Sequence, residues 1–468
     1  MDFTCGLVVV LVIFEGIIIQ CAGVEDETSL HFDQDPSIND IKEDLPILPN
    51  DLIEMIISKT DFKTIHEAVR SYIVPATNLI IGRILQDHII VIDRRCSFDV
   101  SDIHEFHGFG NSYLRICNYT KLVQFFDRFG HQVKKIEINY NSLNSDFPHK
   151  EINQNIIKRC AKHLEELRFG PQGDGGFWED ISDGETYFIF PEVKSFRNSD
   201  DSTRNQFELN LIFPKLKSLK LDGPVADVNC LANVKGLKEL MLRSDSIDEH
   251  KLDDIFANNA NMTKIHLFMP ERRETMGSIA KYLTKLETLV VEFPGENFWL
   301  RANNSEVYKL PSVKHVEIIF DEIDEVFAIE NLSFDMPNLR KLTLNGHQTA
   351  DEIINFINFF KKLDVVELFV NEHIAIKCIE ELQHVKEITT IFYGTETLSL
   401  KKMFERFDEK SKLQTLKFVY FRDSLYKFCE AEMKKINIHL RNFMKPTWTI
   451  SHGEQSGEKY LMFKRDIA

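Results

Sequence analysis

One pattern of hydrophobic and polar positions dominates the chain from residue 133 to its C-terminal region. It reads apolar-x-x-apolar-x-apolar, and its twelve copies start between residues 133 and 413 at a mean spacing of about 25 residues. The alternation at its end predicts a short strand with every second side chain in a shared core. The complete copies are Val133/Ile136/Ile138, Leu164/Leu167/Phe169, Leu216/Leu219/Leu221, Leu237/Leu240/Leu242, Met262/Ile265/Leu267, Leu286/Leu289/Val291, Val313/Val316/Ile318, Leu339/Leu342/Leu344, Leu363/Val366/Leu368 and Leu413/Leu416/Phe418. Two weaker copies, from Val193 and Val385, carry Asn198 and Thr390 at the last apolar position.

Helical patterns fill the return path between these strands. Asp351 is expected to cap one helix, and apolar residues at helical spacing mark a second one before Leu164. Further helical stretches are expected at 247–258 and 398–407. The apolar residues of the first two helices are Ile353, Ile354, Phe356, Ile357 and Phe360, and Ile152, Ile156, Ile157 and Cys160. Each strand-helix unit buries its apolar face only against its neighbours, so about 12 units predict an α/β solenoid with a parallel sheet.

The end of the chain predicts a different element. Apolar and aromatic stretches at 448–450 and 460–463 flank a polar, Gly-containing stretch at 451–458. This order indicates a β-hairpin. We expect the region 431–468 to form a C-terminal cap that covers the exposed strand edge of the last repeat.

The repeated pattern and its spacing resemble those of leucine-rich-repeat proteins over about two thirds of the chain. The resemblance implies a leucine-rich-repeat solenoid over 91–430, with a surface for a protein partner on the concave side of its sheet. The asparagine that follows the strand in this family is present only at Asn141 and Asn371, which predicts irregular turns.

Ahead of the repeats, the region 45–90 predicts two or three short amphipathic helices. It resembles an F-box through Leu48-Pro49, Asp61-Phe62 and the stretch 68–72, although Val69 and Tyr72 replace the family's Cys and Trp. The resemblance implies docking on the adaptor subunit of a cullin-based (SCF) ubiquitin ligase, while the repeats hold the protein to be ubiquitinated in the cytoplasm or nucleus. The implied adaptor-docking residues are Leu48, Pro49, Leu52, Ile56 and Ile57. Alternatively, these residues cap the first repeat.

The first residues leave the compartment open. Residues 1–23 combine an interrupted apolar run with a small-residue site and precede an acidic stretch, 24–44, that we expect to be disordered. This order is typical of a signal peptide, but Asp2 precedes the run, Glu15 interrupts it and no basic residue starts it. The alternatives are a working leader and an apolar extension; an interrupted run disfavours a membrane span. A working leader would make the chain a secreted or membrane-tethered ligand-binding protein with four sequons, at Asn118, Asn261, Asn303 and Asn331.

Composition and motifs narrow the function. The 468 residues include 73 acidic and 56 basic ones, for a formal charge of -17, which disfavours nucleic acid as a partner. The 8 Cys form no CxxC pair, His104 and His107 are interpreted as loop histidines, and neither a nucleophile elbow nor an HExxH motif occurs. We therefore expect a non-enzymatic protein without a cofactor, whose partner is another protein.

Outward strand positions predict where that partner binds, because neighbouring strands bring equivalent residues together. The residue between the last two apolar positions of each copy forms a row that we call the central ladder. Its members are Glu137, Arg168, Arg197, Lys220, Met241, His266, Val290, Glu317, Thr343, Glu367, Thr389 and Lys417. Arg168, Arg197 and Lys220 are consecutive and favour an acidic partner segment. The alternative is local neutralisation by Glu165, Glu166 and Glu239.

A second candidate is the insertion 170–185, which carries Phe177 and Trp178 among Asp and Gly. Aromatic side chains on a loop are typical binding anchors. The alternative is that the insertion folds back as a lid over the repeat.

Overall fold

The computed structural model divides into two compact units, Met1–Ile53 and Glu54–Ala468. All residues described below belong to the second unit. The structure describes residues 85–93, 103–108, 111–116, 119–139, 149–170, 177, 188–199, 208–222, 229–243, 249–268, 273–293, 307–320, 334–346, 349–382, 384–392, 412–420, 448–455 and 458–465. The expected signal peptide, the acidic linker and the five adaptor-docking residues from Leu48 to Ile57 therefore lie outside the described residues.

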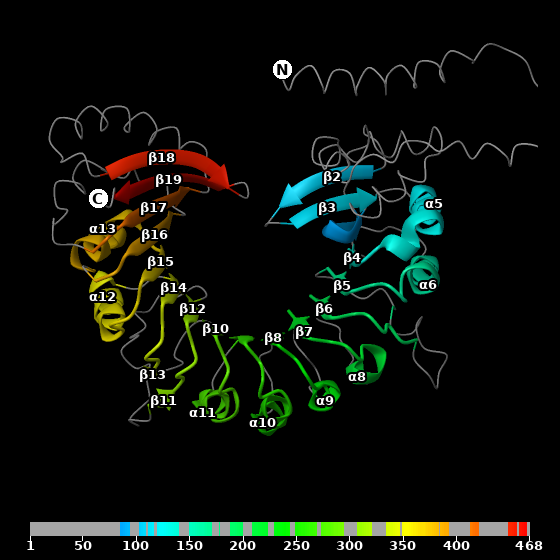
Figure 1. Ribbon diagram of the computed structural model, residues 1–468, viewed down its shortest axis with the longest axis horizontal. Helices are drawn as coiled ribbons and strands as arrows, with labels where there is room; N and C mark the ends of the chain where they lie inside the picture. The colour runs from blue at the N-terminus through cyan, green and yellow to red at the C-terminus, as the bar shows by residue number, and fades with distance from the viewer. Residues whose placement is uncertain are drawn as a thin grey trace, which may run out of the picture. The chain divides into compact units, whose positions relative to one another are not determined.

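The described strands form one 17-stranded sheet and a small two-stranded one (Figure 1). The neighbouring strands follow the order β2, β3, β1, β4 to β10, β12, β14 to β17, β19, β18. Every pairing from β3 to β17 in this order is parallel. The strands are β1 (His88–Ile92), β2 (Ile103–Gly108), β3 (Asn111–Ile116), β4 (Lys135–Ile138), β5 (Glu166–Phe169), β6 (Ser195–Asn198), β7 (Ser218–Leu221), β8 (Glu239–Leu242), β9 (Lys264–Phe268), β10 (Thr288–Phe293), β11 (Tyr308–Lys309), β12 (His315–Phe320), β13 (Phe334–Asp335), β14 (Lys341–Asn345), β15 (Val365–Phe369), β16 (Glu387–Phe392), β17 (Thr415–Tyr420), β18 (Trp448–Gln455) and β19 (Glu458–Arg465).

The labelled helices lie on one side of this sheet, so that we call the opposite side of the strands the inner face (Figure 1). The helical elements are α5 (Tyr119–Phe129), the 3-10 turn η2 (Gly130–Gln132), α6 (His149–Arg159), α8 (Leu209–Ile212), α9 (Asn229–Ala232), α10 (Glu249–Asn258), α11 (Arg273–Tyr282), α12 (Ala350–Phe359) and α13 (Glu372–Glu381). The strand-helix alternation that the sequence predicts is confirmed for most repeats, but in the described residues the short strands β11 and β13 lie between β10 and β12 and between β12 and β14.

Burial follows the twelve copies of the sequence pattern. Every apolar residue of those copies is at most 4% exposed, and Asn198 and Thr390, which replace the last apolar residue in the weaker copies, are buried as well. The side chains form one continuous cluster along the repeats. Removing this much apolar surface from water is the main source of stability in such a stack.

A repeated backbone contact fixes the register between neighbouring repeats. The carbonyl oxygen of Lys134 accepts hydrogen bonds from the N–H groups of Glu165 and Glu166, at 2.7 and 3.0 Å. In each following repeat the equivalent carbonyl oxygen accepts the same pair of hydrogen bonds, up to Lys386, whose oxygen accepts from the N–H groups of Gln414 and Thr415. Because each repeat bonds to the next in the same way, the strands stack side by side with equivalent residues in a row.

The helix expected before Leu164 is present as α6, the one expected at 247–258 is present as α10, and one expected cap is corrected. Ile152, Ile156 and Cys160 are buried, as the pattern of α6 predicts. Asp351 does not cap α12: the N-cap is Thr349, whose hydroxyl accepts from the Glu352 N–H while the Glu352 carboxylate accepts from the Thr349 N–H. A Thr with Glu three residues later is the usual capping box, and Asp351 lies within the first turn. The helix expected at 398–407 lies outside the described residues.

The N-terminal end of the sheet departs from simple repeat order. Strand β1 lies between β3 and β4, and β2 pairs antiparallel with β3. All five residues of β1 are buried, including Ile89 and Val91, which lie on the inner face by register. This strand also crosses residue 90, where the sequence analysis ends the F-box-like region. Next to it on β3, Tyr113 and Arg115 share the inner face by register and are partly exposed. The buried strand β1 therefore interrupts the exposed part of the inner face between β3 and β4.

The C-terminal hairpin is confirmed. Strand β19 pairs antiparallel with β17, and β18 pairs with β19. Phe463 is buried against Phe418, with ring centroids 6.0 Å apart. The hairpin thus covers the edge and the core of the last parallel strand. Together with the burial and register of the repeats, this defines an α/β leucine-rich-repeat solenoid.

Candidate functional site

The central ladder exists as the sequence predicts. Its twelve residues, from Glu137 on β4 to Lys417 on β17, are paired in register at every step. The short side chains of Val290, Thr343 and Thr389 are buried, whereas the other nine members are partly exposed. A parallel sheet is usually covered on both faces, and here a row of partly exposed side chains crosses one of them.

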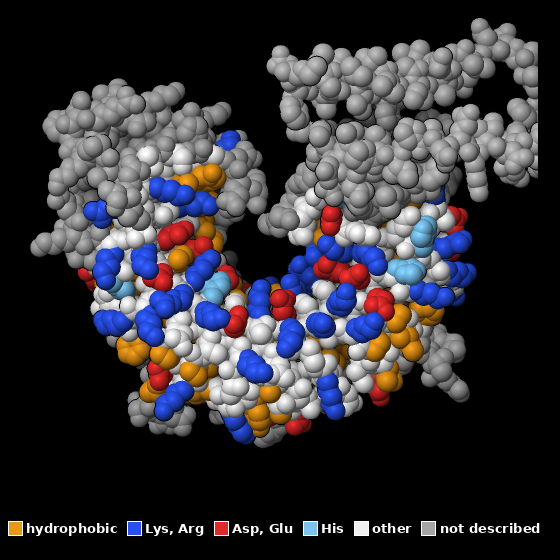
Figure 2. Space-filling view, in the orientation of Figure 1, with side chains coloured by type: hydrophobic (Ala, Val, Ile, Leu, Met, Phe, Trp, Pro, Cys, Tyr) orange, Lys and Arg blue, Asp and Glu red, His pale blue; other side chains and the backbone are white. Residues whose placement is uncertain are grey.

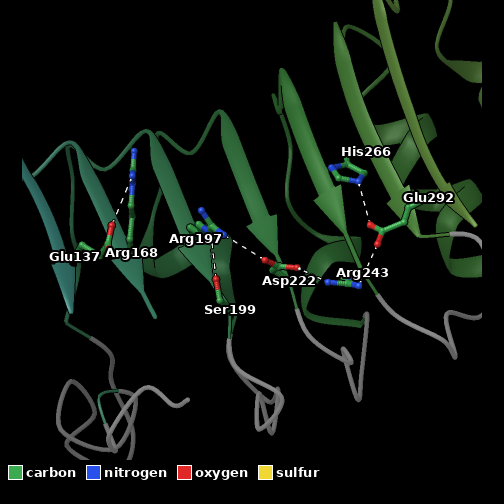
Figure 3. Close-up of polar contacts among 8 residues, drawn as sticks. All are labelled: Glu137, Arg168, Arg197, Ser199, Asp222, Arg243, His266 and Glu292. Atoms are coloured by element: carbon green, nitrogen blue, oxygen red, sulfur yellow. Dashed lines mark hydrogen bonds and ion pairs between the residues drawn. The ribbon is translucent and has the colours of Figure 1, made fainter. Parts of the chain in front are cut away.

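Arg168 is held by two carboxylates. Its Nε donates to Glu166 Oε1 at 2.6 Å, and its Nη1 lies 3.7 Å from Glu137 Oε2 (Figure 3). Burial alone would lower the pKa of Arg168, but Glu166 and Glu137 outweigh it and raise that pKa. Local neutralisation by Glu166, the alternative in the sequence analysis, therefore describes this position.

Arg197 belongs to a longer network that the sequence analysis missed. Arg197 Nη2 donates to Asp222 Oδ2 at 3.2 Å, and the other Asp222 oxygen lies 3.7 Å from Arg243 Nη1. Arg243 Nη2 in turn lies 3.0 Å from Glu292 Oε1, and His266 Nε2 lies 3.5 Å from Glu292 Oε2 (Figure 3). The network spans strands β6 to β10 and holds alternating charges across the inner face.

The hydrogen bond with His266 holds the pKa of Glu292 below its ordinary value, against the effect of burial, and Arg243 adds to it. A carboxylate that is only 12% exposed is therefore kept charged by its neighbours. Asp222, Arg243 and Glu292 each lie two residues beyond a ladder member, on the same face of the strand. They could have been found in the sequence by moving two residues along the chain from each ladder member.

Lys220 differs from both arginines. Among the described residues, its ammonium group has neither an ion pair nor a hydrogen bond. Burial lowers its pKa, and the neighbouring Lys264 and Arg197 lower it further, while Glu239 acts in the opposite direction. The Glu239 carboxylate itself accepts a hydrogen bond from Ser218 Oγ at 3.2 Å.

Glu165 does not neutralise the ladder. Its carboxylate lies 3.4 Å from Lys134 Nζ and accepts from Lys194 Nζ at 2.8 Å, at the turns that precede the strands. The structure therefore separates the three candidate cations: Arg168 and Arg197 are paired locally, and Lys220 is not. The expected basic row is mostly a row of ion pairs.

Beyond β10 the ladder carries two carboxylates, those of Glu317 and Glu367. Glu367 Oε1 lies 2.9 Å from Lys341 Nζ, and its other oxygen accepts from the Thr343 hydroxyl at 3.0 Å. Glu317, in contrast, has no hydrogen bond or ion pair in the part of the chain that the structure describes. Burial raises the pKa of Glu317, and the nearby Glu367 raises it further, while His266 lowers it.

The same half of the sheet also exposes apolar side chains. Ile319, Phe369 and Ile391 are partly exposed and share the row that holds Asp222, Arg243 and Glu292 in the other half. On the hairpin, the ring of Tyr460 lies 4.8 Å from Lys417 Nζ. An apolar patch is visible at the β17–β19 end, and further apolar patches lie along the outer rim of the described surface (Figure 2).

The aromatic insertion requires a correction. Phe177 is fully buried, with its ring centroid 4.9 Å from that of Phe169 and 5.8 Å from that of Phe190. It is therefore a core residue, consistent with the lid alternative, and not an exposed anchor. Trp178 lies outside the described residues.

Other candidate chemistry is not assembled in the described part of the chain. His104 and His107 lie on strand β2 and not in a loop, opposite Arg115 and Ser112. No group of three metal-ligating side chains occurs among the described residues. Burial raises the pKa of the Cys378 thiol to about 12, so this cysteine is a core residue and not a nucleophile. None of the described helices is long and apolar enough to cross a membrane.

Comparisons with known proteins add little to this picture. No protein-family model matches the chain, and no curated protein matches it. Among solved structures, the chain is similar to an internalin from Listeria monocytogenes, at 15% identity and a TM-score of 0.29, over 59% of this chain and 71% of that one. The leucine-rich-repeat fold is therefore assigned from the register and burial of the chain's own strands.

Proposed function

We propose that the chain is a non-enzymatic binding protein that holds a partner protein on the inner face of its repeats. The observation that supports the proposal is the central ladder: partly exposed side chains continue across the inner face from β4 to β17, while the described helices lie on the other side. A rigid row of charged and apolar side chains offers a partner many contacts with little ordering of the receptor.

The test compares one inner-face change with one outer change. Met241→Asp places a charge in the ladder, and Leu211→Asp, on α8, does the same at a helix position that is 53% exposed. Proteins captured from a cell extract by the full chain are quantified by mass spectrometry. A set that is lost with Met241→Asp and retained with Leu211→Asp is expected. Equal capture by both variants would contradict binding at the inner face.

A more specific part of the proposal gives the chain a second binding partner, a ubiquitin ligase. The F-box-like region docks on the adaptor of a cullin-based ubiquitin ligase through its Leu and Ile residues, and the repeats bring a target to that ligase. Its support is the resemblance of residues 45–90 together with their place ahead of the repeats. The adaptor should copurify with the full chain, and the double change Leu52→Asp and Ile56→Asp should remove it. Retention of the adaptor by that double variant would refute the docking role.

The second candidate is an extracellular ligand-binding protein. Its support is the leader-like order of residues 1–23 and the sequon at Asn261, which lies exposed in the turn before β9. The chain is expressed with a C-terminal tag in a secreting eukaryotic cell, and its N-terminus and glycans are mapped. Loss of 23 residues with a glycan on Asn261 would favour this candidate over the ligase receptor; an intact N-terminus without glycans would exclude it.

A further inference from the structure

Two charged members of the central ladder have no close partner in the described part of the chain. Neither the Lys220 ammonium nor the Glu317 carboxylate has an ion pair or hydrogen bond among the described residues. Both side chains are partly buried, and the hydration that each gives up is offset only by charges that make no ion pair with it, such as Glu239 for Lys220 and His266 for Glu317. Other charged ladder members, such as Arg168, Arg197 and Glu367, have local partners. This contrast singles out two positions of opposite sign.

The register fixes the separation of the two charges. Lys220 lies on β7 and Glu317 on β12, with one ladder residue on each of β8, β9 and β10 between them. Four strand spacings of about 4.8 Å give a separation of about 19 Å across the strands. The intervening side chains are Met241, His266 and Val290, so two of the three are apolar.

A helix is the partner element that best fits the inner face from β7 to β12. Each strand from β7 to β12 is paired on both edges, so that an extended segment cannot add to the sheet there. A helix satisfies its own backbone groups and contacts the ladder through side chains alone. At a rise of 1.5 Å per residue, about 19 Å corresponds to about 13 residues.

We propose that strands β7 to β12 hold a partner helix that places an acidic side chain on Lys220 and, about 13 residues away, a basic side chain on Glu317. Apolar side chains of the helix contact Met241, the partly exposed apolar residue between these ends. The inference rests on the proposed function and specifies the chemistry of its partner. Charge complementarity at both ends sets the position of the helix across the strands and excludes segments that carry one sign only.

The probe is a displayed library of 20-residue helical peptides, selected on the full chain and then measured as free peptides by fluorescence anisotropy. Peptides that lose binding to the Met241→Asp chain define inner-face binders. Among them, an acidic and a basic residue separated by 12 to 14 positions should be enriched. Lys220→Glu and Glu317→Lys should each weaken such peptides about tenfold, as loss of a partly buried ion pair does, and exchanging the matching peptide charge should restore binding.

Neutral variants guard against misfolding. Lys220→Met and Glu317→Gln keep the side-chain size, and their thermal unfolding is measured beside their affinities. Inner-face peptides whose affinities change less than twofold in both reversals and both neutral variants would overturn the helix inference while the proposed function stands. Absence of any Met241-sensitive peptide would also overturn the helix inference, whereas the proposed function fails only if the Met241→Asp and Leu211→Asp chains capture the same proteins, so the two failures are distinguishable.

Discussion

The two halves of the sheet share one core and differ at the inner face. Behind β5 to β10 and behind β12 to β17, the inward side chains are equally buried. On the inner face, the first half carries the chain of charges from Arg197 to Glu292, and the second carries Ile319, Phe369 and Ile391 in the equivalent row. The fold therefore constrains the inward positions, and the outward rows are free to differ in chemistry.

The largest effect should be the same in both halves. Phe196 is 1% exposed and stacks on Phe213, while Phe418 is fully buried beside Phe463. Changing either Phe196 or Phe418 to Ala should lower the free energy of unfolding by about 3–5 kcal/mol, because each leaves a cavity in the shared core. Denaturant unfolding measures it. A loss below about 1 kcal/mol at only one site would show that the halves do not share a core of equal quality.

The next effect distinguishes the halves. Asp222→Asn removes the carboxylate between Arg197 and Arg243 and should destabilise the protein by about 1 kcal/mol, since both arginines are more than a third exposed and solvent screens them. The matched change Glu367→Gln leaves one lysine unpaired and should cost about half as much. The difference should shrink at high salt, which denaturant titrations at two ionic strengths would reveal. Equal losses would mean that the network has no extra value.

Two glutamates should respond to pH with opposite signs. The folded-state pKa of Glu292 is lowered, so its contribution is present above the ordinary value of 4.5 and is lost as pH falls through the folded pKa. The pKa of Glu317 is raised, so its favourable contribution is present below 4.5 and is lost as pH rises through the folded pKa.

At neutral pH, Glu292→Gln should therefore destabilise the fold, by about 1 kcal/mol, and Glu317→Gln should stabilise it by less than that. Below the folded pKa of Glu292, the loss from Glu292→Gln should vanish. Thermal unfolding of both variants across pH 3–8 provides the comparison, and effects of the same sign at neutral pH would contradict it.

The smallest effect concerns the hairpin. Lys417 Nζ lies over the Tyr460 ring, and the Tyr460 side chain also passes close to Gly453, where an added Cβ would come within 2.8 Å of the Tyr460 hydroxyl. Tyr460→Leu should cost about 0.5–1 kcal/mol through loss of the cation–π contact. Tyr460→Phe keeps the ring and is the matched control. If both variants unfold at the same denaturant concentration, the contact between the ring and Lys417 has no measurable value.

Sequence reasoning succeeds here where the signal is periodic. The inward residues of all twelve copies and the register of the central ladder follow from a pleat of period two and a repeat of about 25 residues. Sequence reasoning fails where the position of a segment depends on contacts with residues distant in the sequence. The run His88–Ile92 carries no repeat pattern, and its position between β3 and β4 depends on residues far along the chain.

The positions of the site residues on the strands were predictable from the sequence, but their ion-pair partners were not. Arg168, Arg197 and Lys220 look alike in sequence, but only the packed strands show which carboxylates reach which cations. Burial of Phe177 is equally hidden, because an aromatic residue among Asp and Gly is compatible with an anchor and with a folded-back loop. Local composition does not distinguish these outcomes, because tertiary contacts determine them.

Methionine oxidation tests the central claim that ladder side chains are exposed on the inner face and bind the partner. Met241 on β8 and Met462 on β19 are partly exposed, whereas Met262, Met276 and Met336 are at most 3% exposed. Brief radical oxidation with peptide mass spectrometry should modify Met241 and Met462 and spare the other three, and bound partner should protect Met241. Modification of Met262 as fast as Met241, or oxidation of Met241 unchanged by bound partner, would contradict the account.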